Sequence, residues 1–281
     1  AEFLGIMSRV EMLAQFFTHD GGDISKWRLK GHGRERFWEW LASWSVCIRD
    51  PSDLGFDGSR YVLPPIHYHQ HTVESDYTKD GDLFPSIAQT LPERRDAKRN
   101  SLSERVKLAV ELTETDDDYW IIWCHLNDES SALKKALPDA VEVIGTLPSR
   151  EKEDRILSFI RGEKKIVIGK PSIFGFGLNL QHCRNIIFVG MDDSYEMFYQ
   201  SIRRCWRFRQ DREVHVHIIS SSSEGEILKN VERKKKQADE MSQAMVEHMR
   251  EFSQKEIHGT HREVNEYRRE TRSGDQWTLH L

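Results

Sequence analysis

The chain has 281 residues, of which 38% are hydrophobic and 31% are charged, and its formal net charge is −5 at pH 7. This length suits about two domains, and the composition allows a packed core beneath a highly charged surface. The apolar runs are all much shorter than the ~20 residues of a membrane span, and no signal peptide is recognisable. The net negative charge argues against a uniformly basic nucleic-acid-binding surface, but it allows a local basic stripe.

Residues 1–118 are predicted to be mostly helical. The apolar residues from Met7 to Phe17 recur at helical spacing, and a second helix is predicted over Leu102–Leu112. Between them, Phe37–Val46 is rich in tryptophan. A tryptophan cluster can stack on nucleic-acid bases, but large aromatic side chains more often form a buried core, and we favour the core here. The polar residues 76–100 are expected to form a loop or a weakly helical linker.

Three histidines alternate with other residues between His67 and His71. On a β-strand, the side chains of His67, His69 and His71 would lie on one face, which allows either a metal site or a polar strand face. No cysteine or carboxylate lies at ligand spacing beside them, although Glu74 and Asp76 follow. We therefore favour the polar face and predict no metal site.

Residues 119–222 alternate short apolar runs with helical patterns, which predicts an α/β fold with a parallel sheet flanked by helices. Ser149 is predicted to cap the helix that follows it, and Gly162 to end that helix. The predicted strands cover residues 120–124, 141–144, 166–168, 186–189 and 214–219, and the predicted helices cover 128–137 and 149–160, with a third beginning near Ser194.

Ligands of open α/β sheets bind beyond the carboxyl ends of the strands. The loop after Ile166–Ile168 follows one strand end, and the helix that begins near Ser194 follows another. Both segments are therefore expected at the same edge of the sheet, where they would form one shared site.

Arg204 and Arg207 are three residues apart, so on a helix both guanidinium groups would lie on one face. Arginine is always charged, and its planar fork of donors matches phosphate oxygens. Two interpretations are open. The pair could belong to a solvated basic helix face, or it could meet the charge that develops on a transferred phosphoryl group.

The segment Lys165–Gly190 combines two apolar strands with a loop of small residues and the sequence GLNL. It resembles motif V of superfamily 2 helicases, in the form used by Swi/Snf-type translocases. Upstream of it, Tyr119–Leu137 resembles motif IV, the first strand and helix of the second RecA-like domain of these enzymes.

Motif VI of the same enzymes resembles Tyr199–Gln210, which reads YQSIRRCWRFRQ. Gln200, Arg204, Arg207 and Gln210 match that motif in register, whereas Arg209 stands where a glycine is usual. The three motifs occur in the family's order and spacing over Tyr119–Ser220.

The resemblance implies a RecA-like parallel sheet and assigns roles to single residues. Arg204 and Arg207 would act as catalytic arginine fingers on ATP, whose phosphates and Mg²⁺ would be bound mainly by another lobe. Motif V would couple the nucleotide to the DNA backbone. The residues assigned to the nucleotide are Gln200, Gly175, Gly177 and Asn179, and those assigned to the nucleic acid are Lys170 and Ser172.

The sequence contains no G-x-x-x-x-G-K-[ST] segment and no acidic Walker B box. A P-loop cradles the phosphates and its Ser/Thr holds Mg²⁺, so a nucleotide site would need the first lobe of the motor. Glu2–Phe17 resembles the segment after motif III in these enzymes. Residues 28–41, together with Pro51–Asp57 and Tyr61–Ile66, resemble the same region of helicases encoded by phages and prophages. Residues 1–118 are therefore expected to hold the end of the first lobe and the inter-lobe linker.

Residues 223–281 form a charged tail, in which Glu224–Arg250 shows helical apolar spacing around the run ERKKK. This helix could pack back on the domain as a solvated surface, or its basic run, including Lys234, could contact a DNA backbone.

The predicted function is the C-terminal half of an ATP-dependent DNA helicase or translocase, cut inside its first lobe. Its partners would be DNA, most simply duplex DNA, and its own N-terminal RecA-like lobe, without a membrane. The resemblance implies the cytoplasm of a bacterial or phage-infected cell. The alternative is a non-catalytic α/β module that binds nucleic acid or protein without using ATP.

Overall fold

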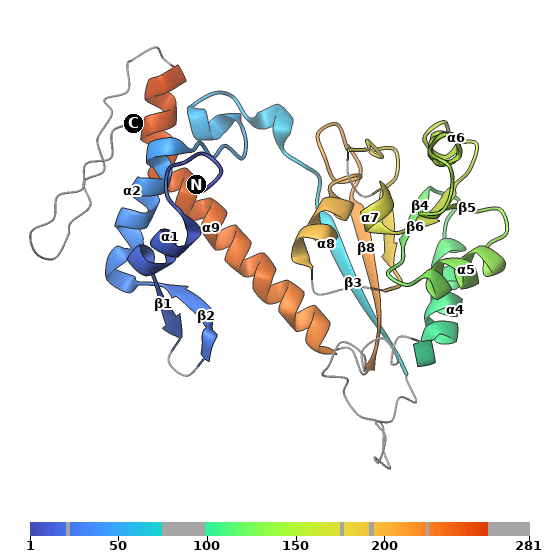
Figure 1. The fold of residues 1–281 in the computed structure, drawn as a ribbon. Helices are drawn as coiled ribbons and strands as arrows, with labels where there is room; N and C mark the ends of the chain where they lie inside the picture. Colours follow the sequence, from blue (N-terminus) through green and yellow to red (C-terminus); the bar gives the residue numbers. More distant parts are fainter. Residues whose placement is uncertain (21–22, 75–98, 175–176, 191–193, 223–224, 258–281) are drawn as a thin grey trace, which may run out of the picture. The chain divides into compact units, whose positions relative to one another are not determined.

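The computed structural model describes residues 1–20, 23–74, 99–174, 177–190, 194–222 and 225–257 (Figure 1). The chain divides into two compact units. The sheet unit comprises Val62–Lys236, and the helical unit comprises Ala1–Tyr61 together with Gln237–Leu281. The sheet unit is thus wider than the predicted range 119–222, because it also includes a strand and a helix that precede that range and the beginning of the tail.

A six-stranded parallel sheet forms the centre of the sheet unit, with the strand order β3-β8-β7-β4-β6-β5. All residues of β4 and β7 are buried, as expected for central strands of a parallel sheet. The predicted RecA-like α/β fold is confirmed. The strands are β3 (Ile66–Val73), β4 (Trp120–Trp123), β5 (Val141–Val143), β6 (Ile166–Gly169), β7 (Asn185–Phe188) and β8 (Val214–Ser221).

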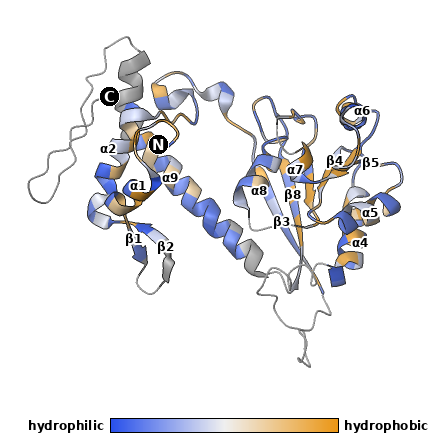
Figure 2. Cartoon of the chain, in the orientation of Figure 1, coloured by the Kyte–Doolittle hydropathy of each residue, from blue (hydrophilic) through white to orange (hydrophobic). Residues whose placement is uncertain are grey.

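Helices cover both faces of this sheet, and each face has its own apolar core (Figure 2). One core contains Phe159, Phe174 and Phe198, which come from three different helices. The other contains Ala109 and Leu133 from two further helices. The helices of the sheet unit are α4 (Leu102–Thr113), α5 (Asn127–Ala136), α6 (Ser149–Ile160), α7 (Pro171–Phe174) and α8 (Tyr195–Ile202).

Helix α6 begins differently from the prediction. Pro148 is its N-cap, and Ser149 is the first helical residue and makes no side-chain capping bond. Proline has no side-chain oxygen to cap the first helical amides, and its carbonyl accepts the first helical bond, from the amide of Lys152 at 3.0 Å. The predicted stop at Gly162 is confirmed, because Gly162 has a φ of +78°, a conformation that glycine adopts without strain.

Strand β3 adds a sixth strand that the sequence did not assign to the sheet. It pairs in parallel with β8, with His67 opposite His215 and His69 opposite His217. A strand of alternating histidines is tolerated here because β3 is an edge strand, so that one of its faces stays partly open to solvent.

The helical unit is not purely helical, because an antiparallel hairpin follows its first helix. Phe16, Phe37, Trp38 and Trp40 are buried together, which confirms the core interpretation for those two tryptophans. Trp27, in the hairpin, is 41% exposed. The elements of this unit are α1 (Arg9–Phe16), β1 (Phe17–Asp20), β2 (Asp23–Leu29), α2 (Arg34–Trp44), and 3-10 turns at Gly31–Gly33, Pro51–Leu54 and Ser59–Tyr61.

Helix α9 (Gly225–Ile257) confirms the predicted helical tail. Its first residues belong to the sheet unit and the rest to the helical unit, where Ala244 and Met245 join the aromatic core. Among the residues described, no helix is both long and apolar enough to cross a membrane. The four cysteines are free thiols, three of them buried. Of residues 76–100, predicted as a loop or linker, residues 76–98 lie outside the described residues, and residues 99–100 are helical.

Candidate functional site

The two motif arginines lie beyond the end of α8 and not on it. Ser194 caps the helix by accepting a hydrogen bond from the amide of Met197 at 3.3 Å, and the helix ends at Ile202. The helix stops because the carbonyl of Arg204 accepts a bond from the amide of Leu180, at 3.0 Å, and Cys205 turns into the core. The expectation that Arg204 and Arg207 share a helix face is therefore wrong.

The turn nevertheless brings the two guanidinium groups together. Nη1 of Arg204 and Nη1 of Arg207 both donate to the carbonyl oxygen of Leu178, each at 3.2 Å. Gln200 holds Arg204 from the other side, because its backbone carbonyl accepts from Nε at 3.1 Å and its Oε1 accepts from Nη2 at 3.0 Å. We call Gln200, Arg204, Arg207 and Leu178 the arginine turn.

Gln210 fixes the far end of this turn. Its buried amide group donates to the carbonyl of Gln181 at 2.8 Å and to that of Cys183 at 3.2 Å. Just before it, Arg209 has a φ of +73°, the left-handed conformation that glycine favours. The chain thus keeps the backbone geometry expected of the usual glycine and accepts about 1 kcal/mol of strain to do so. The guanidinium of Arg209 lies over the Phe208 ring, 5.8 Å from its centroid.

The arginine turn lies at the amino-terminal edge of the sheet. Gln210 bonds to residues just before β7, and Nε1 of Trp206 donates to the carbonyl of Pro64, just before β3, at 2.8 Å. A crossover helix runs antiparallel to the strands, so α8 begins near the carboxyl edge and returns the chain to the amino edge. The two segments expected at one edge therefore do meet at the carboxyl edge, where the loop after β6 and the start of α8 line one cavity, but the arginines at the far end of α8 lie at the opposite edge.

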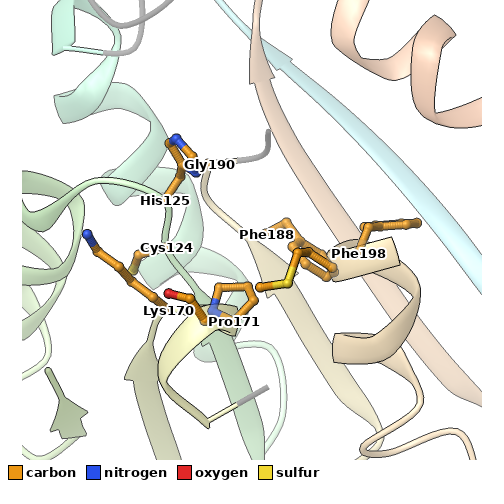
Figure 3. Close-up of a pocket in the computed structure, with 9 residues that line it drawn as sticks. Cys124, His125, Lys170, Pro171, Phe188, Gly190 and Phe198 are labelled. Atoms are coloured by element: carbon orange, nitrogen blue, oxygen red, sulfur yellow. The ribbon is translucent and has the colours of Figure 1, made fainter. Parts of the chain in front are cut away.

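A separate cavity of about 190 Å³ lies at the carboxyl edge (Figure 3). The chain moves from β4 to β5 and β6 on one side and then to β7 on the other, which makes β4 and β7 the switch point where open α/β sheets bind ligands. Figure 3 shows Lys170 and His125 on one side of the cavity and Phe188 and Phe198 on the other. The lining residues are Cys124, His125, Lys170, Pro171, Ser172, Phe188, Gly190, Met197 and Phe198.

Cys124 is the only thiol among these lining residues, and burial, followed by the nearby carboxylates of Glu129 and Glu142, raises its pKa well above the ordinary value. The thiol therefore stays protonated and is a poor nucleophile. The cavity presents one ammonium group, one imidazole and one hydroxyl beside an apolar wall, which suits an anionic group attached to an apolar or aromatic body.

A buried ion pair lies beneath the rim of this cavity. Arg105 of α4 and Glu129 of α5 are both 0% exposed, and Nη1 of Arg105 donates to Oε1 of Glu129 at 2.6 Å. Oε2 of Glu129 accepts from the backbone amides of His125, at 2.7 Å, and Leu126, at 2.9 Å. Nη1 of Arg105 also donates to the carbonyl of Val189. The pair therefore joins the ends of β4 and β7.

The charge of Glu129 is maintained by these partners. Burial by itself would raise the pKa of its carboxyl group, but Arg105 and the two amides hold that pKa below its ordinary value. Gly190 is needed beside the carboxylate, because a Cβ atom there would lie 2.5 Å from both oxygens of Glu129. Charged residues at helical positions resemble a solvated surface in the sequence, so no local signal identified this pair.

Other predicted site residues are distributed between the two edges. Gly177 has a φ of +78°, and Asn179 is exposed and accepts a 3.3 Å bond from the amide of Gln181, next to Leu178. Gly175 lies outside the described residues. Lys234 lies on α9. The neighbouring Lys235 contacts the Tyr68 ring of edge strand β3. Lys234 therefore belongs to neither the cavity nor the arginine turn.

Both sites lie in the part of the chain that is similar to one known family domain. Residues 103–209 match the model described as the helicase conserved C-terminal domain. The matched part of the sheet unit is therefore similar to this domain. Lys170, Ser172, Gln200, Arg204 and Arg207 all lie within the matched range of this domain.

Two solved structures are similar to the chain. The C-terminal part of the Fun30 ATPase domain is 17% identical, with 48% of this chain and 46% of that chain covered and a TM-score of 0.42. A DEAD box protein from the hyperthermophile Methanococcus jannaschii is 20% identical, with 48% and 37% covered and a TM-score of 0.42. The aligned part thus spans less than half of each of these chains. No curated protein matches the chain.

Proposed function

We propose that the helicase C-terminal domain supplies the arginine fingers to a superfamily 2 ATPase that moves along DNA, most closely of the Swi/Snf type and of phage or prophage origin. The observation that carries this proposal is the arginine turn, where Arg204 and Arg207 meet at the carbonyl of Leu178. The first RecA-like lobe of such an enzyme, with Walker A and B, would bind ATP and Mg²⁺ and bring the phosphates to these guanidinium groups.

The electrostatics of the arginine turn favour an anionic ligand. In the described part of the chain, neither Arg204 nor Arg207 pairs with a carboxylate, and both share one neutral carbonyl. Burial, and then the charges of Arg207 and Arg203, lower the pKa of Arg204. It remains charged at any physiological pH. Two like charges held together without a counterion are stabilised when a phosphate arrives, as transition-state stabilisation requires.

The cavity at the carboxyl edge is the proposed nucleic-acid contact. Lys170 and Ser172 provide an ammonium and a hydroxyl group for backbone phosphates. The chain from Lys170 to Leu180 runs from this cavity to the arginine turn, where Leu178 and Leu180 contact the arginines. A DNA phosphate at one end of this segment and a nucleotide phosphate at the other would therefore act on the same short stretch of backbone. The end of the first lobe and the linker would lie before β3, because β3 and α4 belong to the sheet unit.

The chain by itself is expected not to hydrolyse ATP. It contains arginine donors but no phosphate cradle and no Walker carboxylate, so neither the nucleotide nor Mg²⁺ would be positioned. Phosphate release from the purified chain should be measured with and without DNA. Turnover near ~1 per second, the low end of ordinary enzymes, would contradict the two-lobe proposal.

DNA binding by the chain is expected to be weak and salt-sensitive, with Lys170 as a contributor. Replacing Lys170 with alanine should weaken DNA binding equally for different DNA sequences. It should also reduce the salt slope, the slope of the logarithm of affinity against the logarithm of salt concentration, by about 1 in magnitude, because one phosphate contact is lost. Duplex DNA should be titrated at several salt concentrations. Lys164→Ala is the matched control, since Lys164 is an exposed lysine before β6, at the opposite edge of the sheet. Equal effects of the two variants would exclude the cavity as the contact.

Lys234→Ala tests the second proposed basic contact in the same titration. A reduced salt slope in this variant would support a DNA contact by α9, and an unchanged slope would restrict the contact to the cavity.

A non-catalytic binding module remains the rival proposal. In the intact protein, the two proposals differ in whether DNA stimulates ATP hydrolysis. The module should bind DNA in that assay but release no phosphate, whereas the motor should do both.

A further inference from the structure

Five imidazole side chains form a ladder on one face of the β3–β8 pair, which lie side by side in Figure 1. The five side chains alternate between β3 and β8, so each imidazole ring stacks on rings of the opposite strand. Centroid separations are 5.2 Å for His67–His215, 5.4 Å for His69–His215, 4.6 Å for His69–His217 and 5.3 Å for His71–His217, all nearly stacked. The proposed function uses none of these residues. Strand pairing adds His215 and His217 to the three histidines of β3, which reopens the metal interpretation that the sequence alone disfavoured.

Two pairs of nitrogen atoms repeat along the ladder with the same geometry. Nε2 of His69 lies 3.2 Å from Nδ1 of His215, and Nε2 of His71 lies 3.0 Å from Nδ1 of His217. In each pair one nitrogen donates a proton to the other. His67 differs, because its Nε2 lies 3.2 Å from the carboxylate of Glu213 and not from another imidazole.

The same geometry fits a transition metal. Imidazole nitrogens bind divalent metals at ~2.0–2.1 Å, so two neighbouring ligands of one ion lie roughly 2.9–3.4 Å apart for square or tetrahedral arrangements. Both pairs meet that separation without movement of the backbone. In the described part of the chain, no group of three or more histidine, cysteine or acidic side chains surrounds one point, so each pair would supply two ligands and water the others.

We propose that the histidine ladder is a site for a divalent first-row transition metal, chelated across β3 and β8 by His69 with His215 or by His71 with His217. The ion replaces the shared proton of a pair and links the edge strand to its neighbour. Imidazole ligands select Cu²⁺, Ni²⁺ or Zn²⁺, with Cu²⁺ bound most tightly, and disfavour Mg²⁺, which prefers oxygen ligands. This inference does not depend on the proposed ATPase function.

One ion is expected to bind more tightly than a second. The two pairs are two residues apart along both strands, which places them about 7 Å apart. Two divalent charges at that separation repel each other enough to weaken the second site roughly tenfold or more, even with salt screening.

The test is a Cu²⁺ titration of the whole chain, with the number of nitrogen donors read from the electron paramagnetic resonance spectrum at one equivalent. The wild type should show two imidazole donors and a higher thermal unfolding midpoint with Cu²⁺, because the ion binds only the paired strands. His69→Gln or His71→Gln alone should keep one pair and most of the affinity. The double variant should lose Cu²⁺ affinity by more than roughly 10- to 100-fold, which is the loss caused by removing a residue that only hydrogen-bonds to a metal ligand.

His67→Gln is the matched control, because this residue shares the strand and the face but its Nε2 lies beside Glu213 and not beside another imidazole nitrogen. It should bind Cu²⁺ as the wild type does, and millimolar Mg²⁺ should not compete. Circular dichroism with a chelator present establishes that each variant folds. Wild-type affinity and an unchanged spectrum in the folded double variant would overturn the proposal, as would an equal loss in His67→Gln.

Discussion

Replacing Arg204 or Arg207 with alanine in the intact protein should lower DNA-stimulated ATP turnover by about 10³- to 10⁵-fold while leaving ATP affinity nearly unchanged. The reason is that an arginine finger meets charge that develops mainly in the transition state, so its loss affects kcat more than ground-state binding. Arg207→Lys should fail as well, because an ammonium group cannot donate to the Leu178 carbonyl and to a phosphate as a planar fork can. The measurement is steady-state ATPase kinetics with nucleotide affinity determined separately.

Arg203→Ala is the control for this prediction. The guanidinium of Arg203 lies over the rings of Trp206 and Tyr199, at 5.4 and 6.0 Å from their centroids, whereas those of Arg204 and Arg207 meet at Leu178. The Arg203→Ala variant should therefore retain most of the activity. Gln200→Leu should have an intermediate effect, because it removes the Oε1 bond to Arg204 but keeps the backbone one. If Arg203→Ala is as damaging as Arg204→Ala, the assignment of the fingers is wrong.

Breaking the buried pair with Glu129→Gln should lower the free energy of unfolding by about 3–5 kcal/mol. The amide keeps the shape of the side chain but removes the negative charge that neutralises the Arg105 guanidinium, which is 0% exposed. Urea unfolding of the whole chain, followed by circular dichroism, measures this loss. Glu151→Gln is the control, because Glu151 pairs with Arg155 on the partly exposed surface of α6 and such helical pairs contribute only about 0.5 kcal/mol. Similar losses in both variants would contradict the structural role of the buried pair.

The same pair predicts a pH dependence. Because the folded-state pKa of Glu129 is lowered, its contribution is fully present above its ordinary pKa of about 4.3 and is lost as the pH falls through the lowered folded value. Wild-type stability should therefore fall on acidification below about pH 4.3 more steeply than that of Glu129→Gln, whose amide does not titrate. Parallel curves for the two proteins would contradict this linkage.

The regular part of the fold could be predicted from local patterns. The strands β4 and β7 are continuous apolar runs, because they are buried on both faces of the sheet, and the helix over Ser149–Ile160 has a clear period. The matching order of Gln200, Arg204 and Arg207 also indicated which residues belong together. These signals are local, since each depends on burial or spacing within a few consecutive residues.

Only the tertiary structure decided the remaining features of the fold and the sites, because those features depend on contacts between residues far apart in the sequence. β3 joins the sheet through β8, and the five histidines form a ladder only because that pairing sets their register. The Arg105–Glu129 pair is buried only where α4 and α5 meet the sheet. The arginine turn ends α8 because the Leu180 amide takes the carbonyl of Arg204, and the antiparallel return of α8 places the arginines at the edge opposite Lys170. The sequence indicated which side chains the proposed function uses, and long-range packing determined that they lie at opposite edges of the sheet.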